Sequence, residues 1–275
     1  MPLKLMYITN NIEIAKIAEK YGCDRIFVDL ETIGKEERQH GMNTVKSNHT
    51  IEDVSRIKKV LSKSELLVRV NPLYEGSQKE IDTVIDGGAD IVMLPMFRTA
   101  NDARVFVKMV GGRSKVMLLA ETKDALVNLE EICRVPGVDE IHIGLNDLHL
   151  ELHKKFMFEL LIDGTIEKMV SILKKYNKTF GFGGIARLDE GMLPARHIIG
   201  EHYRLGSSMA ILSRSFYDSW ISNDLEEINR VFKYGLIEIR EYESRLEHET
   251  DLFFETNHTL VKEEINNILR IKNEK

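Results

Sequence analysis

Short apolar runs and stretches with apolar residues at helical spacing alternate along the first 215 or so residues. The eight runs are residues 3–8, 25–30, 66–70, 91–94, 116–120, 140–143, 179–182 and 203–205. Strands that alternate with helices predict a parallel sheet, and eight such units predict a (β/α)8 TIM barrel. An open doubly wound sheet is the alternative. The barrel is favoured because no glycine-rich phosphate loop follows the first run.

The chain continues past the eight units with two charged helical segments, 225–246 and 260–271. Each carries an apolar stripe that has to be buried, either on the barrel or on another subunit. We therefore predict a barrel domain over residues 1–220 and a C-terminal helical extension over 221–275. The extension is expected to support a homo-oligomer.

The composition excludes several classes of protein. The net charge is −6 and no basic block occurs, so nucleic acid is not an expected partner. No apolar run approaches the length of a membrane span, and the first residues lack a secretory signal pattern. The two cysteines, Cys23 and Cys133, lie far apart in the sequence. We expect a cytoplasmic protein with reduced thiols and no membrane association.

Two carboxylates stand where strands end. Glu121 follows the run 116–120, and Asp147 follows the run 140–143 by four residues. The carboxyl ends of parallel strands share one edge, where ligands bind. Oxygen ligands suit a divalent cation such as Mg²⁺ or Mn²⁺, so we predict a metal site there. The alternative is that Glu121 caps a helix and Asp147 lies in a turn.

Arg69 lies in an otherwise apolar strand and is expected to face the barrel interior. Its planar guanidinium matches a carboxylate or an enolate, so a substrate role is predicted, with a structural ion pair as the alternative. Asp29 and Glu31 share a face of the second strand. Either could act in acid–base chemistry or pair with Arg69.

Other candidates come from the loops. Gly183 and Gly184 follow the seventh predicted strand, and Ser207 follows the eighth. Loops at these positions often bind phosphate through backbone amides, although the glycines could serve only to turn the chain. His49, at the end of the long connection 32–49, and His149 are candidates for proton transfer, or are solvated loop residues. Asn146 is expected to fix the turn that aims Asp147.

Several ordered motifs carry a family resemblance. They are Val-Asp-Leu-Glu at 28–31, Leu-Val-Arg-Val-Asn at 67–71, Ala-Glu-Thr at 120–122 and Gly-Leu-Asn-Asp-Leu at 144–148. Together they resemble the HpcH/HpaI aldolase and citrate lyase β-subunit family of the phosphoenolpyruvate/pyruvate barrel superfamily. The resemblance implies that Glu121 and Asp147 bind the metal and that Arg69 binds the pyruvate oxygen. It also implies a carboxylate cradle of backbone amides near Asn146.

The resemblance implies a divalent-metal-dependent carbon–carbon lyase that acts on a pyruvate-like 2-oxo acid through an enolate, with Mg²⁺ or alternatively Mn²⁺ or Co²⁺. Aldolases of the family carry a histidine directly after the second-strand glutamate, where this chain has Thr32. The general base is therefore one of Glu31, His49 and His149. The alternatives are an acyl-CoA lyase of the citryl or malyl type, and a non-catalytic barrel that binds an anionic metabolite. The basic loop 35–46 would suit a polyanionic substrate.

Overall fold

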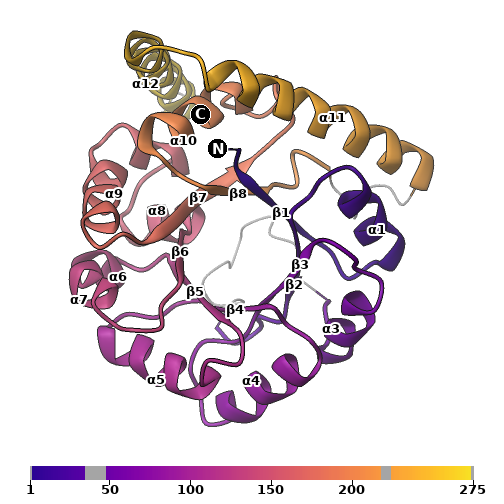
Figure 1. Cartoon of the computed structure of the whole chain (residues 1–275). Coiled ribbons are helices and arrows are strands. Elements are labelled where there is room, and N and C mark those ends of the chain that lie inside the picture. Colours follow the sequence, from indigo (N-terminus) through magenta and orange to yellow (C-terminus); the bar gives the residue numbers. More distant parts are fainter. Residues whose placement is uncertain (1, 35–47, 218–223, 274–275) are drawn as a thin grey trace.

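Eight parallel strands form a closed barrel in chain order, with helices around the outside (Figure 1). The computed structural model describes residues 2–34, 48–217 and 224–273. The strands are β1 (Lys4–Ile8), β2 (Arg25–Asp29), β3 (Glu65–Arg69), β4 (Ile91–Leu94), β5 (Lys115–Ala120), β6 (Glu140–Ile143), β7 (Thr179–Ile185) and β8 (Met209–Leu212). The pairing of β1 with β8 closes the ring and confirms the predicted TIM barrel.

Helices follow the strands and cover the outer face of the barrel. They are α1 (Ile12–Lys20), α3 (Ile51–Lys58), α4 (Ser77–Asp86), α5 (Ala100–Val110), α6 (Lys123–Val127), α7 (Leu129–Cys133), α8 (Leu145–Glu151), the short 3₁₀ helix η1 (Met157–Leu161), α9 (Thr165–Lys175), α10 (Ala195–Leu205), α11 (Leu225–Leu246) and α12 (Asp251–Asn273). The start of α3 shows how the local sequence determines where a helix begins. The Asp53 carboxylate accepts a hydrogen bond from the Thr50 N–H at 2.9 Å, as the capping-box pattern predicts.

Seven of the eight predicted strands are confirmed, and the eighth prediction is wrong. Residues 203–205 are the end of α10, and β8 begins four residues later at Met209. The buried positions Ile198, His202 and Leu205 have helical spacing, which outweighs the short apolar run. Gly206, with φ of 71°, ends that helix in the left-handed conformation.

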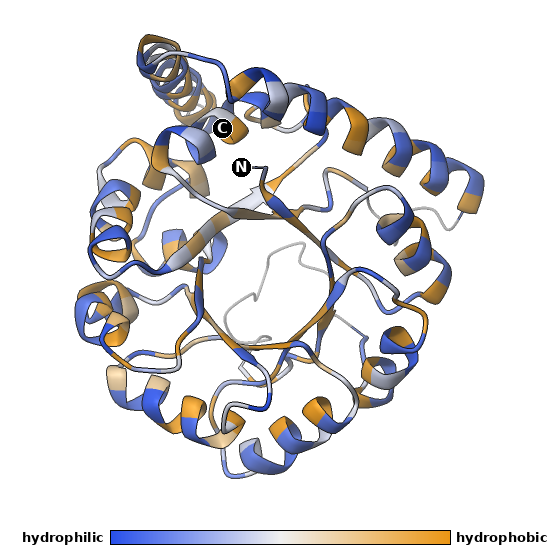
Figure 2. Ribbon diagram, in the orientation of Figure 1, coloured by the Kyte–Doolittle hydropathy of each residue, from blue (hydrophilic) through white to orange (hydrophobic). Residues whose placement is uncertain are grey.

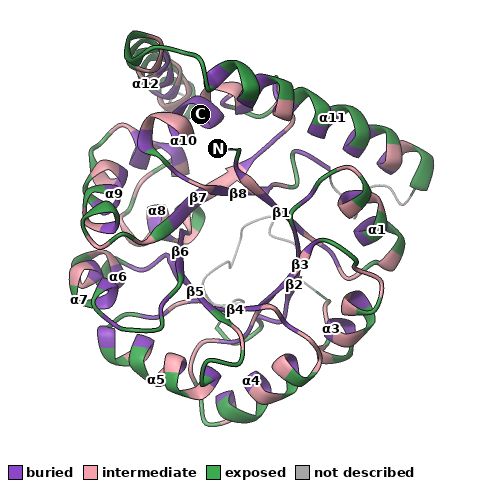
Figure 3. Cartoon of the chain, viewed as in Figure 1, coloured by how far each residue is buried: buried purple, intermediate pink, exposed green. Residues whose placement is uncertain are grey.

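Buried apolar residues lie on both sides of the strand ring, whereas the outer helix faces are exposed and hydrophilic (Figures 2 and 3). One cluster fills the barrel interior: Met6, Phe27, Leu67, Ile91, Met93, Met117, Leu119 and Met209. The larger cluster lies between the strands and the helices. The interior is therefore a packed core and not a channel, as expected for this architecture.

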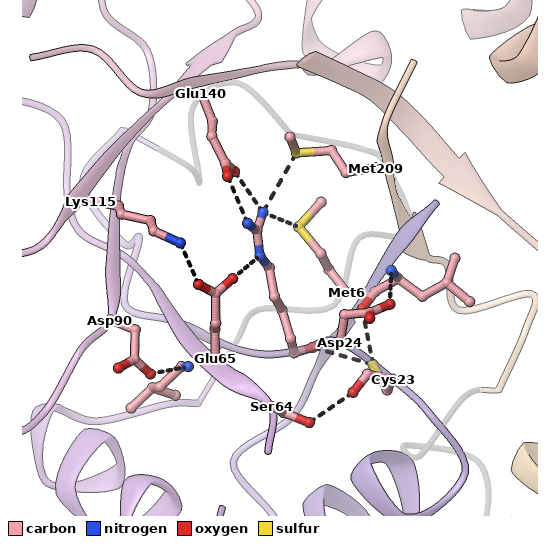
Figure 4. Close-up of polar contacts among 12 residues, drawn as sticks. Met6, Cys23, Asp24, Ser64, Glu65, Asp90, Lys115, Glu140 and Met209 are labelled. Carbon is pink, nitrogen blue, oxygen red and sulfur yellow. Dashed lines mark hydrogen bonds and ion pairs between the residues drawn. The ribbon is translucent and has the colours of Figure 1, made fainter. Parts of the chain in front are cut away.

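A buried ion pair lies inside the barrel near the amino ends of the strands (Figure 4). The Arg25 guanidinium donates two hydrogen bonds to Glu140, at 2.6 and 2.7 Å, and one to Glu65 at 2.9 Å. Lys115 in turn contacts Glu65 at 2.6 Å. Arg25 is completely buried, and the sulfur atoms of Met6 and Met209 lie against it. This cluster is at the opposite end of the barrel from Glu121.

The C-terminal helices have different places in the fold. α11 follows β8 and packs against α1 and α10, so it occupies the position of the eighth barrel helix (Figure 1). α12 lies beyond the ring and packs against α10, where Asn257 donates a hydrogen bond to the His197 carbonyl at 3.0 Å. No helix in the described ranges is long and apolar enough to cross a membrane. The role of the extension in oligomerisation stays a prediction.

Candidate active site

An arginine and two acidic residues meet at the carboxyl ends of β2 and β3. The Nε and Nη2 atoms of Arg69 donate to the two carboxylate oxygens of Asp29, each at 2.8 Å. Nη1 of Arg69 lies 3.3 Å from Oε2 of Glu31. The ion pair that the sequence left as an alternative is therefore present. It leaves the Nη1 edge of the guanidinium, on the Glu31 side, as the edge that can meet a substrate.

Glu121 is held directly after β5 with 2% of its surface exposed. Its Oε1 accepts a hydrogen bond from the Met96 N–H at 3.0 Å. Met96 has φ of 51°, a conformation that costs a non-glycine residue energy and is common at functional sites. Gly144 leaves room for the carboxylate, because a Cβ there would lie 2.9 Å from Oε2 of Glu121.

Electrostatic effects link four groups at this edge. Burial, together with the negative charges of Asp147 and Glu31, raises the pKa of Glu121 to about 8 against the opposing effect of Arg69. Burial disfavours the charge of Arg69, but Asp29, Glu31 and Glu121 outweigh burial and raise its pKa. The structure therefore brings Glu31, Arg69, Glu121 and Asp147 together. This is expected, because the carboxyl ends of the strands of a parallel barrel lie at one common edge.

This charge balance fits a bound divalent cation. Asp29 and Glu31 neighbour Arg69, whereas the buried Glu121 faces the additional negative charge of Asp147. A cation would offset that repulsion, and carboxylate oxygens are the ligands that Mg²⁺ and Mn²⁺ prefer. Across the described parts of the chain, no group of three or more potential metal-binding side chains occurs. Water and substrate oxygens would have to complete the coordination.

The two candidate histidines have opposite tautomers. Nδ1 of His49 accepts the Asp29 N–H at 2.9 Å, so the proton of neutral His49 is on Nε2. Nδ1 of His149 lies 3.2 Å from the Leu145 carbonyl, which can only accept, so neutral His149 has its lone pair on Nε2. Residues two apart on a helix point about 200° apart, so His149 lies away from Asp147 on α8. Only His49 contacts the Asp29 segment.

Two of the loop predictions are wrong in position. Gly183 and Gly184 lie inside β7, where Gly184 pairs with Ile211 beside a register shift, and they form no loop after the strand. Ser207 precedes β8 and therefore lies towards the opposite end of the barrel from Glu121; its hydroxyl contacts Nδ1 of His202 at 2.7 Å. Both errors arise because β7 ends later, and β8 begins later, than the sequence predicted. Asn146 is exposed in the first turn of α8.

A surface cleft of about 420 Å³ lies elsewhere, beside the start of β5. Val107, Lys115 and Asp139 are among the residues that line it. Lys115 and Asp139 are at or just before the amino ends of β5 and β6, so this cleft is at the opposite end from Arg69 and Glu121. We place the candidate site at the carboxyl edge, because the perturbed charged groups gather there.

Comparison with known proteins shows the family of this chain. The model of the HpcH/HpaI aldolase/citrate lyase family matches residues 4–160, which include Glu31, Arg69, Glu121 and Asp147. The chain belongs to the HpcH/HpaI family. A solved HpcH/HpaI aldolase from Desulfitobacterium hafniense has the same fold, with a TM-score of 0.61 and 16% identity over 82% of this chain and 93% of that one.

Two curated relatives of this HpcH/HpaI protein are aldolases. A 2-keto-3-deoxy-L-rhamnonate aldolase of Shigella dysenteriae is 28% identical over 63% of this chain and 71% of its own length. A 4-hydroxy-4-methyl-2-oxoglutarate aldolase of Chaetomium globosum is 24% identical over 62% of this chain and 71% of its own. The predicted family is therefore confirmed.

The HpcH/HpaI barrel of this chain also contains two buried histidines to which the sequence analysis assigned no role. His142 faces the barrel interior, as the alternation from Glu140 requires, and its Nε2 lies 3.2 Å from the Gly183 carbonyl. His202 stacks on Phe182 with ring centroids 3.8 Å apart. Burial lowers the pKa of His142 to about 4 and that of His202 to about 3. Both are therefore neutral at physiological pH.

These histidines predict a loss of stability in acid. The unfolded chain takes up their protons near pH 6.5 and the folded protein only near pH 4 or below, so their contribution is complete above pH 6.5 and is lost as the pH falls towards 4. Between pH 7 and pH 5 the pair should cost about 4 kcal/mol of unfolding free energy. Urea denaturation of the wild type and of a variant without the two histidines, at both pH values, isolates this contribution, because the raised pKa of Glu121 acts in the opposite direction equally in both proteins. The double variant His142→Gln/His202→Asn should lose correspondingly less, and an unchanged difference would refute the assignment.

Proposed function

We propose that this protein is a divalent-metal-dependent carbon–carbon lyase that forms or cleaves a bond to a pyruvate-like 2-oxo acid. The observation that carries the proposal is the placement of Arg69 at the carboxyl edge beside Glu31 and within electrostatic reach of the buried Glu121. Family membership and the two aldolase relatives support the reaction class.

Arg69 would stabilise the negative charge that develops on the substrate oxygen. Asp29 binds the Nε and Nη2 side of the guanidinium and fixes its plane. Nη1 then offers its donors at a defined position, and donors that are held in place before the reaction stabilise a developing enolate most effectively. This arrangement also explains why Asp29 is committed to orientation and is a poor candidate for the base.

Glu121 and Asp147 would hold the cation. When bound, a divalent cation supplies Lewis acidity to the keto group of the substrate. The contact from the Met96 N–H and the space at Gly144 fix the Glu121 carboxylate in one position. By resemblance, the backbone amides near Asn146 would receive the substrate carboxylate.

Glu31 is the general base that we favour. Its carboxylate lies next to the Nη1 edge of Arg69, where the substrate is proposed to bind. The Thr32 hydroxyl donates to Asn71 at 3.2 Å and cannot act as the base that a histidine supplies in related aldolases. His49, with its proton on Nε2 in the neutral form, would serve as a donor and not as an acceptor.

Metal-dependent proton exchange tests the proposal. The protein is incubated with pyruvate in D₂O with Mg²⁺, Mn²⁺ or Co²⁺, and the loss of methyl protons is followed by NMR. We expect exchange that requires the metal and stops on chelation. Silence with all three metals and several 2-oxo acids would instead favour a barrel that binds an anionic metabolite without turnover. Saturation only by CoA thioesters would point to an acyl-CoA lyase.

Metal binding itself gives a separate prediction. Glu121→Gln replaces a charged ligand with a weak neutral one and should lower Mn²⁺ affinity by at least about tenfold, the usual range for disturbed metal sites. Titration followed by electron paramagnetic resonance of free Mn²⁺ measures it. Asp124→Asn, in an exposed ion pair with Arg98, is the matched control and should bind normally. Equal affinities for Glu121→Gln and wild type would exclude Glu121 as a ligand.

A further inference from the structure

Asn71 binds the backbone segment that follows Glu31. Its side-chain oxygen accepts hydrogen bonds from the Thr32 N–H at 2.8 Å and the Ile33 N–H at 3.0 Å. The same oxygen also accepts the Thr32 hydroxyl at 3.2 Å. One amide oxygen therefore accepts three hydrogen bonds from two consecutive residues. Asn71 itself lies two positions beyond the end of β3.

Glu80 of α4 fixes which way the Asn71 amide points. Its carboxylate is buried, with 8% of the residue exposed, and Oε1 accepts a hydrogen bond from Nδ2 of Asn71 at 2.7 Å. A carboxylate accepts hydrogen bonds, and backbone N–H groups only donate. The amide consequently satisfies both sets of partners in one orientation only, with its nitrogen towards Glu80 and its oxygen towards Thr32 and Ile33.

These contacts hold Glu31 from both sides. Before it, the Glu31 N–H donates to Oδ1 of Asp29 at 3.2 Å. After it, the Asn71 oxygen holds the next two residues. The side chains of Arg69 and Asn71, two residues apart in the sequence, thus meet the Glu31 carboxylate and the backbone that carries it. A shift of that backbone would move the carboxylate away from the Nη1 edge of Arg69.

We propose that Asn71, oriented by Glu80, is a positioning residue that keeps the Glu31 carboxylate aligned with Arg69 for proton transfer. The catalytic part of this inference rests on the function proposed above. The contacts themselves do not. Neither residue touches the proposed metal ligands or the substrate edge of Arg69 in the contacts described.

Variants that exchange the amide and the carboxylate between positions 71 and 80 test the proposal. Asn71→Asp places a second carboxylate against Glu80; when both are ionised they repel and the segment 32–33 is released, so all variants are compared at a pH high enough to ionise both. Glu80→Gln alone keeps an acceptor for Nδ2 of Asn71. In the double variant, the new amide at position 80 donates to the new carboxylate at position 71, whose other oxygen accepts the Thr32 and Ile33 amides. The double variant therefore reverses the direction of the hydrogen bond between positions 71 and 80 and keeps the acceptor for the Thr32 and Ile33 amides.

We expect kcat for exchange to fall about 10- to 100-fold in Asn71→Asp, because small displacements of reacting groups have effects of this size. KM should change much less. Glu80→Gln should stay within about threefold of wild type, and the double variant should recover most of kcat. Asn101→Asp, which adds the same charge at an exposed position on α5, should have no effect.

Amide hydrogen exchange at Thr32 and Ile33 gives a readout that does not depend on activity. Both amides should be protected in wild type, Glu80→Gln and the double variant, and should exchange fast in Asn71→Asp. If protection follows this pattern while kcat does not, Asn71 has a structural role only and the proposal is overturned. Unchanged protection in Asn71→Asp would overturn the contacts themselves. An inactive wild type would defeat the proposed lyase function, while hydrogen exchange would still decide whether the segment is held.

Discussion

Replacing Arg69 with lysine is expected to lower the metal-dependent exchange of pyruvate protons by about 10²- to 10³-fold, the usual effect of losing one preorganised donor. Lysine keeps the charge but has one donor centre and no planar fork. It cannot bind both oxygens of Asp29, as the Nε and Nη2 atoms of Arg69 do, and also place a donor beside Glu31.

Lysine is the informative replacement at this position. Arg69→Ala would leave the buried Asp29 and Glu31 without their cation, which costs about 3–5 kcal/mol of stability and confuses misfolding with lost chemistry. Arg98→Lys is the matched control, because Arg98 is an exposed arginine that contacts Asp124 near the same edge of the barrel. Mn²⁺ affinity should survive in both lysine variants. If Arg69→Lys keeps exchange within a few-fold of wild type, Arg69 does not stabilise the enolate.

The largest effect on stability is expected at the other end of the barrel. Arg25→Met should lower the unfolding free energy by about 3–5 kcal/mol, because it leaves the buried Glu140 carboxylate without its two hydrogen bonds. Replacing both partners, as in Arg25→Met/Glu140→Met, should recover most of that loss, since a well-packed apolar pair often matches a buried ion pair. Denaturant titration measures all three proteins.

An exposed ion pair serves as the control for this series. Arg113→Met removes the contact with Asp82, in which both side chains are more than 40% exposed, and should change stability by less than about 1 kcal/mol. Proton exchange activity should be normal in the double variant, because the cluster lies at the opposite end from Arg69. If Arg25→Met costs no more than Arg113→Met, the cluster does not stabilise the fold.

Local periodicity was sufficient to predict most of the barrel. Seven strands and the site residues Glu31, Arg69, Glu121 and Asp147 could be placed, because parallel strands end at one common edge. The eighth strand could not, since the apolar positions before Gly206 fit the buried face of α10 as well as a short strand. Because the eighth strand was predicted too early in the sequence, Ser207 was predicted to follow it at the carboxyl end of the barrel. In the structure Ser207 precedes β8 and lies towards the amino end.

The contacts that support the site residues could not be predicted from the local sequence pattern. Glu80 meets Asn71 nine residues away, and the Met96 amide reaches Glu121 from a different strand end, so neither follows from spacing along one element. His142 is different. Once Glu140 is placed inside the barrel, period-two alternation puts His142 there as well, and this signal was available in the sequence.

The position of α11 decides where this protein can be shortened. Its residues Ile228, Phe232, Leu236 and Ile239 are almost completely buried, and each contributes about 1.5–3 kcal/mol, so together they rival the net stability of an ordinary domain. A truncation at residue 220 would remove the helix that completes the outer ring and would expose the apolar outer faces of β1 and β8. A cut between α11 and α12, at residues 247–250, would leave the strand ring covered but would expose the face of α10 against which Val261 and Ile265 of α12 are buried.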